Sequence, residues 1–324
     1  MTVTAGTMGN ADGVARGKAR NAVIQDRIFF YITLFSAILI VVLLLGVIAS
    51  LLIGAWPAIS TFGLSFVWTQ RWSPVKEIFG ALAPIYGTVI TSIIAMVIGI
   101  PVSFGIAIFL TEICPVPLRR PIGIAIELLA GIPSIIYGLW GFFFLAPFLQ
   151  TTIQPFLIGS IGKVPGIGVL FGGAPYGIGL LTAGIILAIM VLPFITSITR
   201  DVFQTVPTLL RESAYGMGMT TWEVVKSIII PYCRVGLVGG IMLGLGRALG
   251  ETMAVTFVIG NSHNISPSLL APATTISATI ANEFTEATGD LYTSSLIELG
   301  LILFVITFAV LGLAKWMLTR AEVK

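Results

Sequence analysis

Charged residues are scarce in this sequence, and their scarcity decides the broad class of protein. Aspartate, glutamate, lysine and arginine make up only 10% of the 324 residues, whereas hydrophobic residues make up 56% and the mean hydropathy is +1.04. Soluble domains carry about 25% charged residues, so the composition excludes an ordinary soluble protein. The short alternating segments of a transmembrane β-barrel are also missing. The chain is therefore predicted to be an all-α membrane protein.

Residues for metal and thiol chemistry are equally few. The two cysteines, Cys114 and Cys233, adjoin predicted cytoplasmic helix ends, where thiols stay reduced, so no disulfide is expected. The single histidine, His263, has no cysteine or carboxylate near it at metal-ligand spacing. The sequence therefore predicts no metal site, no cofactor and no catalytic residue.

A nucleotide-binding motif is missing as well. The pattern G-x-x-x-x-G-K-[ST] does not occur, and the nearest stretch, GSIGKVPG, lacks both the glycine spacing and the final serine or threonine. The chain is therefore not expected to hydrolyse ATP at a Walker-type site, or to be an enzyme.

Long apolar runs are what the sequence has in abundance. Six of them are near or above the ~20 residues that a membrane-crossing helix requires. The first is far longer than the 7–15 apolar residues of a signal peptide, so we expect it to remain as an anchor. The six spans are predicted at roughly Ile28–Gly54, Pro84–Leu110, Ile122–Phe148, Gly177–Ile198, Val235–Gly260 and Leu291–Leu318.

The cations are distributed unevenly between these spans. With the N-terminus inside, thirteen lysines and arginines fall on the cytoplasmic side and three in outer loops, while Arg247 lies within a span. This positive-inside bias predicts that both termini are cytoplasmic. The thirteen are Arg16, Lys18, Arg20, Arg27, Arg119, Arg120, Arg200, Arg211, Lys226, Arg234, Lys315, Arg320 and Lys324; the three are Arg71, Lys76 and Lys163.

The last outer loop, Asn261 to Asp290, contains two prolines and three acids but no lysine or arginine. Its middle, APATTISATIANEF, predicts a short helix that lies at the outer surface or dips into it.

A polar segment, RESAYGMGMTTWEVVKSIIIP, separates the fourth and fifth spans. The stretch that leads into it, Pro207 to Tyr215, is compatible with a short helix, since proline is tolerated in a first turn. Gly216 and Gly218 then interrupt the pattern, because glycine turns the chain at helix ends.

A second helix is predicted to start at Thr220. Thr220 and Glu223 have the spacing of a capping box, and the helix is expected to run to about Ile229, where Pro231 stops it. One face would be apolar and the other polar, with Trp222, Val225 and Ile229 on the first and Glu223 and Lys226 on the second.

The spacing of this segment resembles the EAA loop of ABC-type importer permeases. The family pattern is EAA, three residues, Gly, nine residues and I-x-L-P, and every spacing agrees here, with Ser213 and Ile230 as mild departures. In that family the loop forms coupling helices that dock into a cleft on a separate ATPase subunit. The resemblance implies coupling roles for Glu212, Ser213, Ala214, Gly218, Trp222, Glu223, Ile228 and Pro231.

The resemblance extends over nearly the whole chain. The segments FGALAPIYGTVITS, GIAIELLAGIPSIIYGLWG and GLGRALGETMAVTFVIGN are similar to PstC-type permeases of phosphate importers. The resemblance implies the type I ABC importer permease fold, phosphate as cargo, a PstA-type permease as heterodimer partner, two PstB-type ATPase copies and a periplasmic phosphate-binding protein. It also implies a multi-pass protein of the bacterial inner membrane.

The predicted organisation has three parts. Residues 1–27 form a disordered cytoplasmic tail, residues 28–54 form the first transmembrane anchor helix, and residues 81–318 form the permease domain with coupling helices at about 207–231.

Ionisable residues inside the spans are the candidate site. Gly240, Gly244, Arg247 and Glu251 fall on one face of a helix, and small residues there let a neighbouring helix approach closely. Arg247 and Glu251 are candidates for the anion's pathway, because a guanidinium binds an oxyanion through two parallel hydrogen bonds. The alternative is that the two residues neutralise each other and pin helices together.

The third span carries a second candidate group. Glu127 shares a predicted small-residue face with Ser134, and Pro133 is expected to kink or loosen the helix. These three residues are predicted to have a gating or structural role. Glu298, in the sixth span, is interpreted as an interfacial residue.

Two other functions remain open. A permease for sulfate or molybdate would use the same arginine chemistry, and only the resemblance favours phosphate. A secondary transporter would need a coupling-ion site and an internal inverted repeat, and no repeat is evident.

Overall fold

The computed structural model describes the backbone of residues 6–322 and the side chains of residues 24–316, and this part of the chain is helical, without a β-strand. The α-helices are α1 (Gly6–Phe62), α2 (Ser65–Trp68), α3 (Leu82–Ile108), α4 (Val116–Ala130), α5 (Ser134–Trp140), α6 (Ala146–Phe148), α7 (Gln154–Gly159), α8 (Leu180–Gln204), α9 (Thr208–Gly216), α10 (Thr221–Val224), α11 (Ile230–Gly250), α12 (Met253–Val258), α13 (Ile276–Glu283) and α14 (Asp290–Glu322). The side chains of Arg16, Lys18, Arg20 and Arg320, and the whole of Lys324, lie outside the described residues.

The chain divides into two compact units, with the boundary between Ile53 and Gly54. The first unit is most of helix α1, and no side chain in its most apolar stretch is buried. An apolar helix that buries none of these side chains is typical of a lipid-facing anchor. Helix α1 begins at Gly6, so the backbone of residues 6–27 is helical where the sequence predicts a disordered tail; no proline interrupts the chain before Pro57.

Within the described part of the chain, six helical segments are long and apolar enough to cross a membrane, as the sequence predicts. The third differs from its prediction, because it covers Ser134–Lys163 and not Ile122–Phe148. Helix α4 ends at Ala130, and the chain is not helical at Pro133, whose ψ is 137°. Proline lacks an amide hydrogen and disfavours helical geometry in the preceding residue, so the predicted kink at Pro133 is a complete break.

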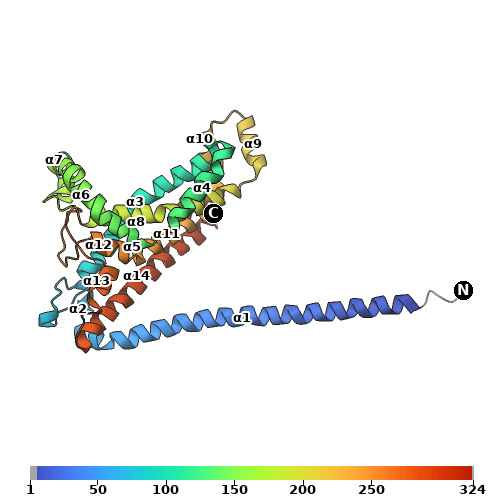
Figure 1. Cartoon of the computed structure of the whole chain (residues 1–324), viewed down its shortest axis with the longest axis horizontal. Helices are drawn as coiled ribbons and strands as arrows, with labels where there is room; N and C mark the ends of the chain where they lie inside the picture. Colours follow the sequence, from blue (N-terminus) through green and yellow to red (C-terminus); the bar gives the residue numbers. More distant parts are fainter. Residues whose placement is uncertain (1–5, 323–324) are drawn as a thin grey trace. The chain divides into compact units, whose positions relative to one another are not determined.

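The core of the second unit lies between α3, α8 and α12. In Figure 1, α9 and α10 lie with α4 at one end of this unit, and α2 and α13 lie at the other. The two buried cysteines are free thiols.

Helix α13 lies within the outer loop for which the sequence predicts a short helix. Its first residue, Ile276, is fully buried, and the Ile276 amide donates to Thr88 Oγ1 on α3 at 2.9 Å. The segment before it crosses α3 at Gly87, where a Cβ would lie 1.9 Å from the carbonyl oxygen of Thr274. A glycine is therefore needed at 87 for this segment to pack into the unit.

We expect Gly87→Ala to destabilise the protein by about 1–3 kcal/mol, because a backbone oxygen cannot rotate away from the new methyl group. Gly105→Ala is the matched control on the same helix, since a Cβ there meets nothing within 4 Å. Thermal unfolding of the purified variants measures both effects. Equal melting temperatures for the two variants would contradict the packing at Gly87.

Glu283, the last residue of α13, collects three side-chain donors. Trp72 Nε1 and Tyr292 Oη each lie 2.6 Å from Glu283 Oε2, and His263 Nε2 lies 3.0 Å from Oε1. The His263 ring stacks on Trp72 with 5.1 Å between centroids. Burial of the carboxyl opposes its ionisation, but the hydrogen bonds from His263, Tyr292 and Trp72 outweigh burial and hold the pKa of Glu283 below its ordinary value.

A depressed carboxyl pKa stabilises the fold above the unfolded value of 4.5 and loses that contribution as the pH falls through the lower folded pKa. We therefore expect Glu283→Gln to lower the free energy of unfolding by about 1.5–3 kcal/mol at neutral pH. Below pH 4.5 the free energy of unfolding of this variant is expected to fall less steeply with decreasing pH than that of the parent. Unfolding measured between pH 3.5 and 7 tests this, with Glu286→Gln, an exposed acid of the same loop, as the control. The same fall in unfolding free energy at acid pH in Glu283→Gln as in the parent would rule out this role.

Candidate functional site

Arg247 lies three residues before the end of α11 and lines a cavity of about 820 Å³. The cavity is bounded by α8, α11 and α14, and its lining is apolar except for Arg247 and Lys315. The other lining residues are Ile198, Val202, Gly236, Gly239, Gly240, Met242, Leu243, Gly246 and Leu311. A cation at the wall of an apolar cavity has few competing partners there, so its field acts strongly on any anion that enters.

The Arg247 guanidinium has no carboxylate partner among the described side chains. None of the ion pairs among the described residues includes it, and its buried Nε has no hydrogen-bond partner in this part of the chain. Its carbon Cζ lies 4.4 Å from the centroid of the Phe194 ring on α8, which is a cation–π contact. The ring compensates only part of the charge, so the guanidinium retains hydrogen-bonding capacity for an anion.

Helix α11 approaches α8 through a stripe of glycines. A Cβ on Gly236, Gly240 or Gly244 would lie 2.8–2.9 Å from side-chain carbons of α8. The predicted close approach is therefore confirmed, and α8 is the neighbour. Gly239 faces open space on another side of α11, toward the Arg247 cavity.

Glu251 does not continue the α11 face on which the sequence predicts it. Helix α11 ends at Gly250, and Glu251 has an extended backbone with φ of −69° and ψ of 132°. Its Oε1 instead accepts a long hydrogen bond, 3.5 Å, from the amide of Ala254 at the start of α12. Gly250 is a poor helix former, and the Thr252 hydroxyl donates to its carbonyl at 3.3 Å, so the break is local in origin. The predicted Arg247–Glu251 neutralising pair is wrong for this conformation.

Glu127, Pro133 and Ser134 do not share one helix face, because the break at Pro133 separates them. Glu127 is on α4, and its Oε1 accepts from Arg200 Nη2 on α8 at 2.7 Å. Ser134 is the first residue of α5. This ion pair between two helices fits a structural role for Glu127, while a gating role remains a prediction.

Glu298 is 5% exposed and its Oε2 has no partner among the described residues. The carboxyl is therefore buried within the protein and not solvated, while its interfacial depth stays a prediction.

The predicted coupling segment begins with α9. Ala214 is fully buried, whereas Glu212 and Ser213 are exposed. Gly218 adopts φ of +84°, which side-chain-bearing residues rarely adopt, so the predicted glycine turn is confirmed. The buried Ala214 anchors α9, and the Glu212 side chain is exposed at the surface.

The start of α10 is the predicted capping box. The Glu223 amide donates to Thr220 Oγ1 at 3.4 Å, and the Thr220 amide donates to Glu223 Oε2 at 2.8 Å. Trp222 differs from its prediction, because it is 64% exposed and lies on the side of Glu223 and Lys226. Val224, Val225 and Ile229 form the buried side instead.

Pro231 does not end this helix, which corrects the prediction. A π-helical turn, Val225–Ile229, directly precedes α11, and Pro231 lies within the first two positions of α11. The wider turn bonds the Ile230 amide to the Val225 carbonyl, five residues back, and so removes the usual conflict between a proline ring and the carbonyl four residues back. As a result the chain is helical from Thr221 to Gly250.

Sequence reasoning did not predict the contact that holds α9 in place. Arg211 Nη1 lies 2.7 Å from Glu112 Oε1, in the π-helical turn after α3, and Arg211 Nη2 donates to the Phe203 carbonyl. Both residues are charged at span ends in the sequence, but nothing local indicates that they pair across 99 positions.

Together, the helical spans, the broken helices at Pro133 and Gly250, and the capped two-helix segment define a membrane transport permease. The fold agrees with solved ABC importers. A bacterial alginate ABC transporter in complex with its alginate pentasaccharide-bound periplasmic protein matches with a TM-score of 0.61 at 16% identity, over 93% of this chain and 97% of that chain. The MetNI methionine ABC transporter in an inward-facing form matches with a TM-score of 0.53 at 15% identity, over 77% of this chain and 99% of that one. The fold is that of type I ABC importer permeases.

Residues 105–323 match the family model described as binding-protein-dependent transport system inner membrane component, and the chain belongs to this family. It is therefore a multi-pass inner-membrane protein. The phosphate transport system permease protein PstC of Mesorhizobium japonicum is 67% identical over 94% of this chain and 93% of the relative. The protein of the same description from Pasteurella multocida is 56% identical over 93% and 94%. The probable one from Methanocaldococcus jannaschii is 39% identical over 87% and 90%. The PstC-type resemblance is thus confirmed.

Proposed function

We propose that the chain is a permease subunit of an ATP-driven phosphate importer, and that Arg247 binds the anion on its pathway. The observation that carries this proposal is the Arg247 guanidinium in a largely apolar cavity without a carboxylate partner. A guanidinium pairs with a phosphate through two parallel hydrogen bonds, which strengthen away from water. The PstC relatives support phosphate as the cargo.

Glu251 contributes to the same pathway in this proposal. It lies in the two-residue break between α11 and α12, where irregular backbone at membrane depth is tolerated because it lines a cavity or is buried in protein. Four positions separate it from Arg247, so both residues lie along the same part of the proposed pathway.

Transport energy enters through the coupling segment. Helix α10, the π-helical turn and α11 form one helical run from Thr221 to Gly250. Trp222 and Arg247 are 25 positions apart on it, which corresponds to roughly 38 Å at 1.5 Å per residue. A displacement of α10 is therefore transmitted to Arg247 through a continuous helix. The anion pathway then opens alternately to the two sides of the membrane as the partner ATPases close and open.

The assembly follows from this arrangement and from the family. We assign the partners as a PstA-type permease subunit, a PstB-type ATPase dimer that carries out the hydrolysis, and a periplasmic phosphate-binding protein. Both termini and the coupling segment lie in the cytoplasm, which the thirteen-to-three distribution of cations supports.

The proposal is tested by the ATPase activity of the complete complex in lipid nanodiscs. We expect binding protein loaded with phosphate to stimulate hydrolysis several-fold, and binding protein offered sulfate or molybdate to give the basal rate. Stimulation by sulfate or molybdate would assign another oxyanion. Uptake that persists without the ATPase and collapses with the ion gradient would replace the proposal with a secondary transporter.

A further inference from the structure

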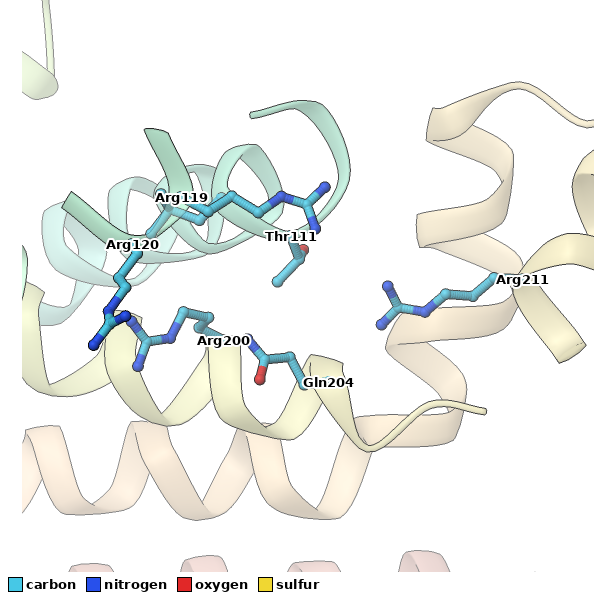
Figure 2. A pocket seen from close by; sticks show the side chains of 7 residues that line it. Thr111, Arg119, Arg120, Arg200, Gln204 and Arg211 are labelled. Atoms are coloured by element: carbon cyan, nitrogen blue, oxygen red, sulfur yellow. The ribbon is translucent and has the colours of Figure 1, made fainter. Parts of the chain in front are cut away.

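A second cationic pocket lies where α9 packs near the ends of α4 and α8. It has a volume of about 310 Å³, and four arginines from three helices line it (Figure 2). Arg119 and Arg120 come from α4, Arg200 from α8 and Arg211 from α9. No carboxylate lines it; the remaining lining residues are Leu110, Thr111 and Gln204.

The carboxylates around this pocket leave two arginines without a counter-charge. Glu127 and Asp201 both pair with Arg200, and Glu112 pairs with Arg211.

Arg119 donates from Nε to a neutral carbonyl, that of Cys114, at 3.0 Å. Arg120 is exposed and makes no hydrogen bond or ion pair within the part of the chain that the structure describes. The charge of this pair is therefore available to a ligand.

The chemistry of the lining selects the class of ligand. Guanidinium groups present planar donor pairs that match the oxygens of a phosphoryl group, and several such groups together accommodate its second charge. The Gln204 amide and the Thr111 hydroxyl add neutral polar groups to the lining. Basic pockets between membrane helices bind phosphorylated headgroups for the same reason.

This pocket is separate from the Arg247 cavity. The two share no lining residue, although both use α8. Ile198 and Val202 line the Arg247 cavity, whereas Arg200 and Gln204 line the four-arginine pocket. Two positions along a helix correspond to a rotation of about 200°, so the two sites open on opposite faces of α8. An anion bound in one site therefore does not occupy the other site.

We propose that the four-arginine pocket binds a phosphoryl anion, either the headgroup phosphate of an anionic lipid or free inorganic phosphate, and that the bound anion ties α9 to α4 and α8. Arg211 belongs to the coupling segment, while Arg119, Arg120 and Arg200 belong to the spans. An anion shared among them neutralises their mutual repulsion and restrains α9 against the spans. The site goes beyond the transport of the cargo and does not depend on which anion is transported.

The test uses the complete detergent-solubilised complex after delipidation. One arm measures equilibrium binding of radiolabelled inorganic phosphate, and a second measures retention of short-chain phosphatidylglycerol by native mass spectrometry, with phosphatidylcholine as the zwitterionic control. We expect Arg120→Gln to weaken binding in one of these arms about tenfold, since it removes charge-assisted hydrogen bonds to the anion. Arg120 has no structural ion pair to lose, so the variant is expected to fold as the parent does.

Two matched variants assign the site. Lys226→Gln removes an exposed cation of the coupling segment that does not line the pocket, and we expect it to leave binding unchanged. Arg247→Gln removes the cation of the other cavity and is expected to leave the Arg120-dependent binding intact. A phosphate response identifies the free anion, and a phosphatidylglycerol response identifies the lipid. Binding in neither arm, or binding that Arg120→Gln leaves unchanged, overturns the proposal.

Discussion

We expect Arg247→Gln to lower phosphate uptake at least about a hundredfold while the complex still assembles. Glutamine keeps a donor of similar reach but removes the charge and the second parallel hydrogen bond to the anion. Each charge-assisted hydrogen bond contributes about 1.5–3 kcal/mol, so the loss of the second bond, together with the loss of the donor's charge in the first, reaches about the 2.7 kcal/mol that corresponds to a hundredfold change. Radiolabelled phosphate uptake into cells whose only copy of this subunit is the variant measures the effect, and co-purification of the partner subunits measures assembly.

The same cavity supplies the control for this experiment. Lys315 is its other cation, near the end of α14. We expect Lys315→Gln to retain most of the uptake, because the lysine is exposed and water already screens its charge. Phosphate uptake by Arg247→Lys is expected to lie between that of wild type and that of Arg247→Gln, since an ammonium keeps the charge but lacks the planar pair of donors of a guanidinium. Near-normal uptake in Arg247→Gln would remove Arg247 from the anion's path.

The second large effect is expected at the exposed apolar side chains of the coupling segment. Met217 is 75% exposed and Trp222 is 64% exposed, although both are apolar. Tryptophan is enriched among the residues that dominate binding energy at interfaces, where truncation costs about 2 kcal/mol or more. We expect Met217→Asp combined with Trp222→Asp to release the ATPase subunits from the complex and to abolish uptake, because two carboxylates are then desolvated on docking.

A pull-down of the ATPase with the tagged permease measures this loss directly. The control is Val75→Asp, which introduces one aspartate at a 95% exposed apolar residue outside the coupling segment. We expect this control to keep both the ATPase and the uptake. Full ATPase retention by the double variant would show that the docking surface lies elsewhere.

Local patterns in the sequence predicted much of the architecture. The six apolar runs, the capping box at Thr220 and Glu223, the turn at Gly218 and the glycine stripe of α11 each depend on residues within a few positions of one another. Such signals concern hydrophobic length, helix caps and backbone conformation, which are properties of short segments. They are sufficient to predict the class of protein and the position of the coupling pattern without any tertiary contact.

Two local signals were misread because a neighbouring turn changed their meaning. Pro231 is a stop signal in a regular α-helix, but the π-helical turn before it accommodates the ring and the helix continues. The four-residue spacing of Arg247 and Glu251 predicts a pair only if the helix continues, and α11 ends between them at Gly250. In both cases the outcome depended on which backbone hydrogen bond formed.

The sequence by itself determined that this is a helical membrane permease with six apolar spans, and which segment has the coupling pattern, while the position of the third span was set by the break at Pro133. Only the tertiary structure decided the partners of its charges. Arg200 meets Glu127 across 73 positions, Arg211 meets Glu112 across 99, and Arg247 meets the ring of Phe194 and no carboxylate of the described residues. Hydrophobic length and helix capping act between near neighbours in the chain, whereas electrostatic pairing depends on distance in space, and that distance is set only when the helices pack.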